Sequence, residues 1–466
     1  MKLPDGPKLS ALLQILQIIA QPTKFLETCA QRYGDTFTLK VLGRGSPPVV
    51  FFSAPEAIEA IFTDVSNRLD FGQVTEVFRP LVGSQSLIFQ QGKQHQLSRQ
   101  LLMPPLHGKS LASYGEQIQA ITSTSLQSWS EGTRLKIRDY TAQITLQVIL
   151  QVVFGVGSFG LDSCRRAEQL QALIPSFLER VNSPWQSVQF FWPPLQQDWG
   201  AWSPWGQFLR QRQQIDNLIY AEIAERRIEQ QKQEPGNDVL SMLVSARTEM
   251  GKPLGDEELR DQLITVLLLG QDTTASALAW AFYWIHQHPE VRSRLVQELS
   301  SLGEHPDPVT VAQLPYLNAI CQETLRIHPI ALIAQPRQVR EQVELEGYSF
   351  APGTILVPCI HLAHHRSNTF SHPEVFNPER FLNRKFSPYE YFPFGGGSRS
   401  CIGMALSLFE MKLILATVLS RYGLELANSG PVRPTRRGIT IVPSDAFQLR
   451  VTHRRQTNAP KELSTL

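Results

Sequence analysis

An apolar stretch near the middle of the chain, Leu263–Ile285, most strongly constrains what this sequence can fold into. It is long enough to cross a lipid bilayer. Its centre, however, holds the polar residues Gln271–Thr274, at the depth where a helix facing lipid is most destabilised. The helical pattern starts near Asp256 and stops before Pro289. We therefore expect one long helix buried in the core of a large folded protein.

The composition is that of a globular protein. Of the 466 residues, 42% are hydrophobic and 18% are charged, which excludes a disordered or fibrous chain. The formal net charge of +2 argues against a dedicated nucleic-acid binder. The five cysteines are odd in number and irregularly spaced, so we expect no disulfide framework and a reducing, cytoplasmic location.

The N-terminal run Leu9–Ala20 is too short to span a bilayer, and Gln14 and Gln17 interrupt it. We therefore expect no targeting segment and no transmembrane anchor. Weak peripheral contact with a membrane remains an alternative.

Helical patterns dominate the rest of the chain. They run through Gly108–Gln297 and recur at Leu314–Ile327, whereas short β-like runs occur at Pro48–Phe52 and within Gln335–Pro358. A last helix is predicted over Ile402–Gly423, with the glycine as its C-cap. No linker separates independent halves. These patterns predict a mainly α fold with a small β-rich lobe.

A histidine cluster could suggest a metal site. His361, His364, His365 and His372 follow a predicted strand, so the fixed scaffold that metal ligands need is missing from the pattern. A solvated loop with hydrogen-bonded histidines is the preferred interpretation.

The most informative segment is Phe394–Gly403, which reads Phe-Gly-Gly-Gly-Ser-Arg-Ser-Cys-Ile-Gly. Three consecutive glycines permit positive φ and close approach of the backbone to a flat group. Cys401 stands directly before an apolar helix, whose free N–H groups and positive dipole end stabilise a thiolate. Gly403 allows the first helical turn to lie close to a planar ligand.

These residues resemble the haem loop of the cytochrome P-450 family, Phe-x-x-Gly-x-Arg-x-Cys-x-Gly. Every fixed position of that loop is present, at Phe394, Gly397, Arg399, Cys401 and Gly403. The resemblance implies haem b with the Cys401 thiolate as axial iron ligand. It also implies a single cytochrome P-450 domain over residues 1–466, with haem between the central helix and the helix that follows Cys401.

Further segments strengthen the resemblance. Glu323 and Arg326 match the family's Glu-x-x-Arg, and Pro378–Phe381 matches the motif whose arginine, here Arg380, joins them in a buried network. By resemblance these three charged residues are structural, and removal of one strands a buried charge.

The centre of the long helix resembles the family's oxygen-activating kink, Gly270–Thr274. By resemblance the Thr273 hydroxyl and Asp272 deliver protons. The family usually has Ala or Gly where this chain has Leu269, so we expect a narrower space over the haem. Leu269 and Gly270 are predicted substrate contacts, together with Ala331, Leu332 and Ile333.

Four basic residues are candidates for the haem propionates. His95 and Arg99 lie four residues apart, which places both on one helical face, and they correspond to a propionate-binding segment of the family. Arg337 and Arg399 are further candidates, because a guanidinium binds a carboxylate in a bidentate fashion.

The resemblance implies a monooxygenase that inserts one oxygen atom from O2 into a C–H bond of a hydrophobic small molecule. Its electrons would come from a ferredoxin- or flavodoxin-type donor, docking near Arg384, Lys385 and Lys412. Retinoic acid or a similar retinoid is the first substrate candidate, since several segments look most like the retinoic-acid hydroxylase branch. Fatty acids and sterols or other terpenoids are alternatives, as are a peroxygenase and a non-catalytic haem-binding sensor.

Five of the eight tryptophans fall within Pro184–Gly206, whose prolines prevent a continuous helix. In the resembled family this position lies beside the access channel. The segment is predicted to be a lid over the substrate entrance, with core packing and shallow membrane contact as alternatives.

Overall fold

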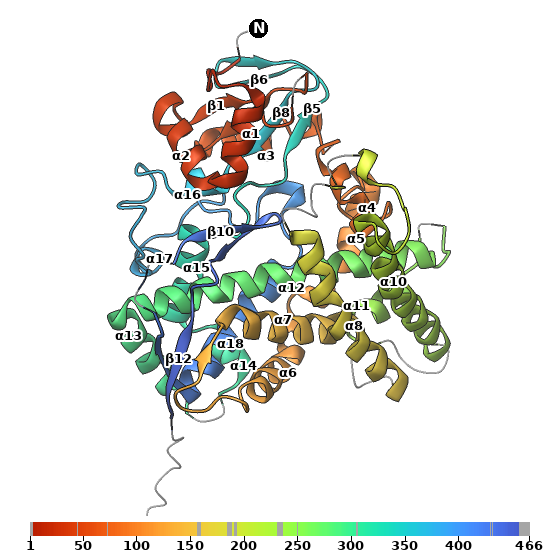
Figure 1. The fold of residues 1–466 in the computed structure, drawn as a ribbon, viewed down its shortest axis with the longest axis vertical. Helices are drawn as coiled ribbons and strands as arrows, with labels where there is room; N and C mark the ends of the chain where they lie inside the picture. Colours follow the sequence, from red (N-terminus) through yellow and green to blue (C-terminus); the bar gives the residue numbers. More distant parts are fainter. Residues whose placement is uncertain are drawn as a thin grey trace, which may run out of the picture.

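The computed structural model describes residues 3–43, 45–71, 73–155, 160–183, 189–190, 193–230, 236–248, 250–303, 306–428, 430 and 432–455. Helices form most of the molecule, and short strands gather at one end (Figure 1). The mainly α fold with a small β-rich lobe, predicted from the sequence, is confirmed.

The helices follow one another along the whole chain and are longest in its middle third. The α-helices are α1 (Ala11–Ala20), α2 (Pro22–Tyr33), α3 (Pro55–Phe62), α4 (Arg79–Val82), α5 (Gly92–Leu102), α6 (Lys109–Ser125), α7 (Ile137–Phe154), α8 (Gly160–Asn182), α10 (Pro204–Glu229), α11 (Val239–Ser245), α12 (Asp256–Gln287), α13 (Pro289–Ser300), α14 (Pro308–Ala312), α15 (Pro315–Ile327), α16 (Ile360–His364), α17 (Glu379–Asn383) and α18 (Met404–Arg421). Short 3-10 turns are η1 (Ser66–Arg68), η2 (Gln73–Phe78), η3 (Pro104–Leu106), η4 (Pro193–Leu195) and η5 (Gly397–Arg399).

The β-rich lobe is built on a five-stranded sheet in the order β1-β2-β8-β5-β3. Its strands are β1 (Thr36–Leu39), β2 (Val49–Phe52), β3 (Leu69–Asp70), β5 (Arg337–Val339) and β8 (Ile355–Pro358). β2 and β8 pair in parallel, and every residue of both is buried. Burial on both faces explains why these strands read as continuous apolar runs.

The remaining strands form smaller sheets. β4 (Arg134–Leu135), β12 (Leu449–Arg454) and β9 (Tyr422–Leu426) form one, while β6 (Val343–Leu345) pairs with β7 (Tyr348–Phe350) and β10 (Pro434–Arg437) with β11 (Thr440–Pro443).

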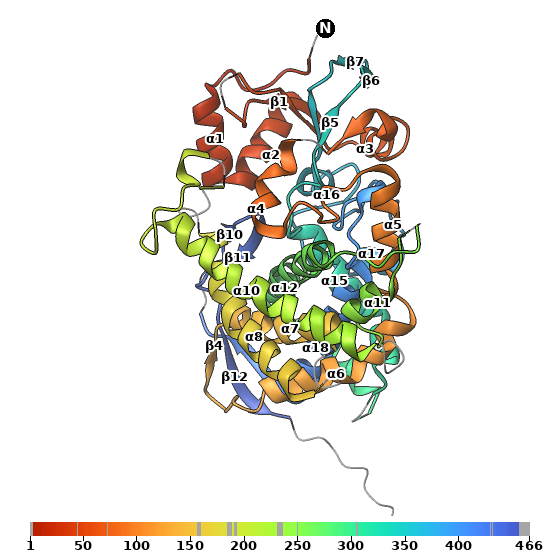
Figure 2. The same ribbon diagram turned by 90° about the vertical axis from the view of Figure 1, so that its right-hand side faces the viewer.

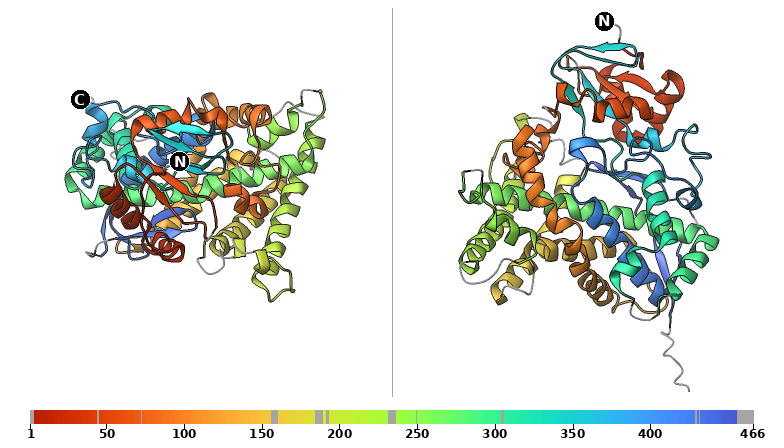
Figure 3. Two further views of the ribbon diagram at one scale, coloured as in Figure 1. Left: turned by 90° about the horizontal axis from the view of Figure 1, so that it is seen from above. Right: turned by 180° about the vertical axis from the view of Figure 1, so that it is seen from behind.

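α12 is the central helix, and α7, α10, α15 and α18 pack around it (Figures 1 and 3). Asp256, Glu257 and Glu258 in its first turn favour the positive end of the helix dipole, and Pro289 stops it. Within the described residues it is the one helix long and apolar enough to cross a membrane, and 83% of its most apolar window is buried inside the protein. The predicted buried core helix is therefore confirmed.

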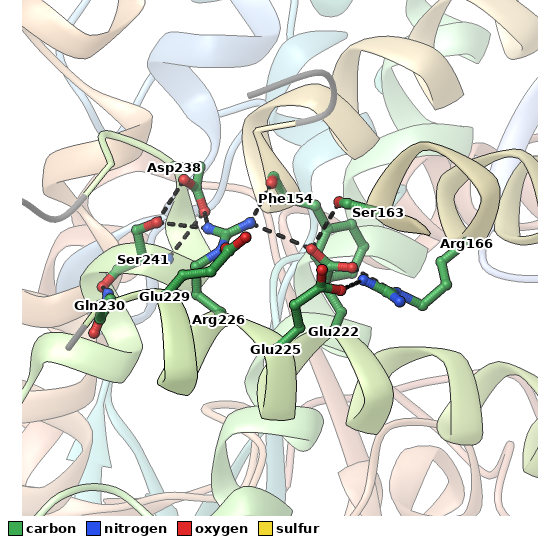
Figure 4. Close-up of polar contacts among 10 residues, drawn as sticks. All are labelled: Phe154, Ser163, Arg166, Glu222, Glu225, Arg226, Glu229, Gln230, Asp238 and Ser241. Carbon is green, nitrogen blue, oxygen red and sulfur yellow. Dashed lines mark hydrogen bonds and ion pairs between the residues drawn. The ribbon is translucent and has the colours of Figure 1, made fainter. Parts of the chain in front are cut away.

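A buried ion cluster joins α8, α10 and α11 at the end of α7 (Figure 4). Arg226 of α10 donates to Asp238, the N-cap of α11, at 2.8 Å and to the Phe154 carbonyl at 2.7 Å. It also donates to Glu222 at 3.3 Å, and Glu222 accepts from Arg166 of α8 at 2.7 Å. These contacts hold four helices in one arrangement, because a buried charge that loses its partner is strongly destabilising.

The predicted C-cap at Gly423 is wrong. α18 ends at Arg421, and Gly423 lies in β9, which pairs with β12. A Cβ on Gly423 would lie 2.2 Å from Cε1 of His453 and 2.6 Å from Oγ1 of Thr452. Glycine is needed because β12 approaches this strand closely, and not because a helix turns there.

The predicted solvated histidine loop is also wrong. His361 and His364 are buried in α16, and Nε2 of His361 lies 2.7 Å from the Glu27 carboxylate. His364 accepts the backbone N–H of Phe392 at 3.0 Å. No group of His, Cys, Asp and Glu among the described residues could hold a metal ion. These histidines connect α16 to α2 and to the segment before Cys401.

The tryptophan-rich segment divides into two parts. Trp205 is buried, with its ring 5.8 Å from that of Phe190 and 5.0 Å from that of Phe208. Trp199 and Trp202 are exposed. Trp185 and Trp192 lie outside the described residues. Core packing therefore holds for Trp205 and not for the exposed pair.

Candidate functional site

Three charged side chains predicted to form a buried network do meet. Glu323 and Arg326 lie one turn apart on α15, and neither is exposed. Arg326 donates to both carboxylate oxygens of Glu323, at 2.7 and 2.8 Å, and to the His364 carbonyl at 2.9 Å. Arg380 of α17 donates to Glu323 at 3.1 Å, as does the backbone N–H of Asn377 at 2.9 Å. The network holds α16, α17 and the segment between them against α15.

The glycine run before Cys401 packs against an aromatic ring of the protein itself. Gly395 and Gly397 have φ angles of 70° and 67°, a region that favours glycine. A Cβ on Gly396 would lie 2.2 Å from the ring of Phe62 at the end of α3. The flat group expected from the sequence to approach the glycines is, at Gly396, this phenylalanine.

Cys401 is the exposed cysteine of the chain, although protein groups surround it. Burial raises the pKa of its thiol, and the N–H of Gly403 and the charge of Arg99 oppose that rise. Cys321 and Cys359 are fully buried, and burial raises the pKa of each thiol to about 12. Cys401 is thus the cysteine that a ligand can reach.

The arginines predicted to bind carboxylates come together near Cys401. Burial lowers the pKa of Arg337 to about 9, and repulsion from Arg399 adds to the shift. Burial likewise lowers the pKa of Arg399 to about 10, where attraction to Asp70 opposes the shift and repulsion from Arg99 adds to it. These guanidinium groups therefore lie close enough to repel one another in a poorly solvated place.

Their hydrogen bonds go mainly to the backbone. Arg99 donates to the Ser400 carbonyl at 2.6 Å and to the Ser400 hydroxyl at 2.9 Å. Arg337 donates to the Gly396 carbonyl at 3.2 Å, and Arg399 donates to carbonyl groups of the segment before α5. Nε of Arg399 is buried without a partner among the described residues. The contacts described for the three arginines leave their positive charge without a bound carboxylate.

His95 lies one turn before Arg99 on α5 and is buried. Burial lowers the pKa of its imidazole to about 4, and the positive charges of Arg399 and Arg99 add to the shift. The imidazole is therefore neutral at pH 7, with one nitrogen that donates and one that accepts.

One short face of α12 is not covered by protein. From Leu259 to Tyr283 every residue of the helix is buried except Leu269, Gly270 and Thr273. Spacings of three and four residues place these three on one side of the helix. A Cβ on Gly270 would lie 3.0 Å from Cδ1 of Ile149 on α7, so glycine there allows the two helices to pack closely.

The two predicted proton-delivery residues have different neighbours. The Thr273 hydroxyl donates to the Leu269 carbonyl at 2.8 Å. The Asp272 carboxylate accepts from Arg138 of α7, and Nε of Arg437 in β10 lies 3.7 Å away. The sequence analysis missed these two arginines, and no pattern in the chain points to them, since Arg138 is 134 residues from its partner.

The remaining predicted substrate contacts, Ala331, Leu332 and Ile333, lie between α15 and β5 and are half-buried. Leu332 and Ile333 pack against the apolar cluster of α2, β1, β2 and β8. The Leu332 carbonyl accepts the N–H of His361 at 3.0 Å. The contacts described for them are therefore with the β-rich lobe.

The cations expected to steer an electron donor are not equally free. Lys412 is half-buried, and its ammonium donates to the Ala312 carbonyl at 2.9 Å. Arg384 is about half exposed and is paired with Glu390. Lys385 is exposed. The expectation of a surface charge at Lys412 is therefore wrong, because its side chain satisfies a helix carbonyl.

The fold and the site define a class of protein: a helix-rich chain with one accessible cysteine before a long helix, surrounded by buried arginines. The sequence model of the cytochrome P-450 family matches residues 4–451. The chain belongs to this family, and it is a monooxygenase-type oxidoreductase.

Relatives and solved structures agree. The chain is 33% identical over 464 residues to a putative cytochrome P-450 135B1 of Mycobacterium bovis, covering 99% of this chain and 94% of the relative. It is 31% identical to a putative cytochrome P-450 135A1 of Mycobacterium tuberculosis, covering 97% and 96%. Retinoic acid-bound cyanobacterial CYP120A1 has a TM-score of 0.81 at 24% identity, covering 97% of this chain and 100% of that chain. The cytochrome P-450DA heme domain also has a TM-score of 0.81, at 21% identity, covering 98% and 97%.

The family implies haem held by a cysteine thiolate, and the residues present fit that group. The accessible sulfur of Cys401 is a suitable ligand. A Cβ on Gly403 would have that sulfur as its neighbour at 3.9 Å, so a larger residue would stand beside the ligand atom. Arg99, Arg337 and Arg399 supply positive charge for two propionates.

The buried network predicts a stability effect. Glu323→Gln removes the carboxylate that neutralises Arg326 and Arg380, so we expect the free energy of unfolding to fall by about 3–5 kcal/mol. Denaturant titration followed by circular dichroism measures this change.

The matched control is Glu425→Gln, which breaks the exposed pair of Glu425 with Arg450 and is expected to cost less than about 1 kcal/mol. Equal losses in the two variants would contradict the assignment of a structural role to the buried network.

Proposed function

We propose that this chain is a haem-thiolate monooxygenase that inserts one oxygen atom from O2 into a C–H bond of a long apolar substrate. Cys401 is the axial ligand, and a retinoid such as retinoic acid is the first substrate class. A ferredoxin- or flavodoxin-type protein donates the electrons. The observation that carries the proposal is the accessible Cys401 sulfur among three buried arginines whose described contacts include no carboxylate.

The arginines bind and orient the cofactor. Arg99, Arg337 and Arg399 would hold its two carboxylates, and neutral His95 adds a hydrogen bond. Carboxylates there would relieve the repulsion that lowers the pKa of Arg337 and Arg399. Haem bound through Cys401 supplies the oxidising chemistry.

Thr273 and Asp272 handle protons on the α12 side. The Thr273 hydroxyl gives its hydrogen to the Leu269 carbonyl, which leaves its oxygen free to accept a hydrogen bond from water at the uncovered face. Asp272 is held toward α7 and β10 by Arg138 and Arg437. It must leave this pairing to pass a proton inward, so the arginine pair controls when the carboxylate takes part.

A retinoid suits the apolar residues of the uncovered face. Leu269 presents a bulky side chain beside Gly270, which favours a slender chain over a broad ring system. The similar fold of a cyanobacterial cytochrome P-450 was solved with retinoic acid bound, which supports testing this class first. Fatty acids are the second candidate, since they share the long apolar chain and the terminal carboxylate.

The first prediction concerns the ligand. Cys401→Ser is expected to abolish the long-wavelength carbon monoxide band of thiolate-ligated ferrous haem, because an alcohol is a far weaker donor. Absorption spectra of the reduced protein with carbon monoxide measure it. Cys164→Ser, at a half-buried cysteine on α8, is the control and should keep the band. A retained band in Cys401→Ser would reject the assignment.

The second prediction concerns proton delivery. Thr273→Ala is expected to bind substrate normally but to lower the product formed per reduced nucleotide consumed by at least about ten-fold, since a positioned proton donor is worth about 10²–10⁴-fold. Product and peroxide are measured with a surrogate reductase.

Thr274→Ala is the matched control one residue further along α12. Its hydroxyl lies 3.1 Å from that of Ser407 on α18, so it should leave the coupling of electrons to product unchanged. If both variants behave alike, Thr273 has no special part in proton delivery.

The third prediction concerns the substrate. Retinoic acid is expected to displace water from the iron and to bind at least about ten-fold more tightly than retinol, palmitate or a sterol, since a matched charged hydrogen bond is worth about 1.5–3 kcal/mol. Optical difference titrations measure the four dissociation constants. Tighter binding of palmitate would move the assignment to fatty acids, and tighter binding of the sterol would move it to terpenoids.

A further inference from the structure

Helix α1 is amphipathic in the reverse sense. Its large apolar residues face outward, with Leu12 66% exposed and Leu16 53% exposed. The one fully buried residue of the helix is Gln14. A helix on the surface of a soluble domain normally shows the opposite pattern.

The buried glutamine has a clear structural reason. Nε2 of Gln14 donates to the Leu9 carbonyl at 2.9 Å and to the Pro7 carbonyl at 3.2 Å. Its Oε1 accepts the backbone N–H of Lys40, just after β1, at 2.8 Å. These bonds hold α1 in a fixed orientation on the β-rich lobe, so the outward apolar face is built into the fold.

The exposed apolar residues form one continuous stripe. Spacings of three and four residues place them on the same side of the helix. They are Leu9, Leu12, Leu13, Leu16 and Ile19, each at least 41% exposed. Their number exceeds the scattered single apolar side chains normal on a protein surface. α1 itself carries no charged residue, whereas Lys8 before it and Lys24 after it are exposed.

A second exposed apolar feature lies on the same side of the molecule. Trp199 and Trp202, 53% and 73% exposed, stack with ring centroids 6.1 Å apart in the segment that leads into α10. In Figure 2, α1 and the start of α10 both project at the left edge, and the left view of Figure 3 places both along one edge. Two elements far apart in sequence therefore present apolar side chains in one direction.

We propose that this face, the stripe of α1 together with the Trp199–Trp202 pair, docks shallowly on an anionic phospholipid bilayer. Ten helical residues extend about 15 Å, so α1 lies in the interface and does not span it. Tryptophan is the residue preferred at the boundary of headgroups and acyl chains. Lys8 and Lys24 match anionic headgroups, and apolar faces flanked by lysine bind such surfaces.

Vesicle flotation of the haem-loaded full chain tests the proposal. We expect the protein to float with vesicles of phosphatidylcholine and phosphatidylglycerol, and less with phosphatidylcholine alone. Leu12→Glu combined with Leu16→Glu is expected to lower the partition coefficient at least ten-fold, as is Trp199→Ser combined with Trp202→Ser. Brominated lipids should quench tryptophan fluorescence in the wild type, and quenching should fall when the tryptophan pair is removed.

Leu382→Glu is the matched control, since Leu382 is a 39% exposed leucine on α17, which lies on the opposite side in Figure 2. It should float like the wild type, and all variants should keep the wild-type melting temperature because the changed side chains are exposed. Three results would overturn the proposal: no flotation of the wild type with either vesicle, equal flotation of all variants, or a lipid-free dimer that Leu12→Glu with Leu16→Glu dissociates. The last would assign the face to a second copy of the chain.

Discussion

The buried pairing of Glu323 with Arg326 and Arg380 is the interaction on which the arrangement around Cys401 depends. Neither Glu323 nor Arg326 is exposed, so each charge can exist there only while the other is in place. One carboxylate accepts from α15, from α17 and from the segment between α16 and α17. This segment and α17 precede the glycine run in the chain, and their fixed position determines where the run starts toward Cys401.

Electrostatics divides the site into two parts. Around Cys401, buried arginines repel one another and donate to backbone carbonyl groups, so this part favours a ligand with carboxylates. On α12 the balance is reversed, because Asp272 has two arginines as neighbours while Thr273 stands at the uncovered face. The first part is suited to hold a cofactor in place, and the second to hold a proton until it is needed.

The exposed apolar residues follow a different logic. Trp205 lies only three residues beyond Trp202, yet one ring is buried among aromatic residues and the other faces outward. Sequence composition marks the whole segment as rich in tryptophan and cannot separate these roles. In α1 the sequence suggests a helix with two interrupting glutamines, but only the hydrogen bonds of Gln14 show that its apolar face is turned outward.

The sequence by itself determined the features that depend on local chemistry. Periodicity, acidic first-turn residues and Pro289 define α12, and motif spacing identifies Cys401 and the pair Glu323 and Arg326. These signals are readable because they arise from neighbours within one or two helical turns. Tertiary structure alone decided that Arg138 pairs with Asp272, that Phe62 fills the space at Gly396, and that Gly423 admits a neighbouring strand. Such contacts join residues far apart in the chain, where packing and the loss of water select the partner and no local pattern records the choice.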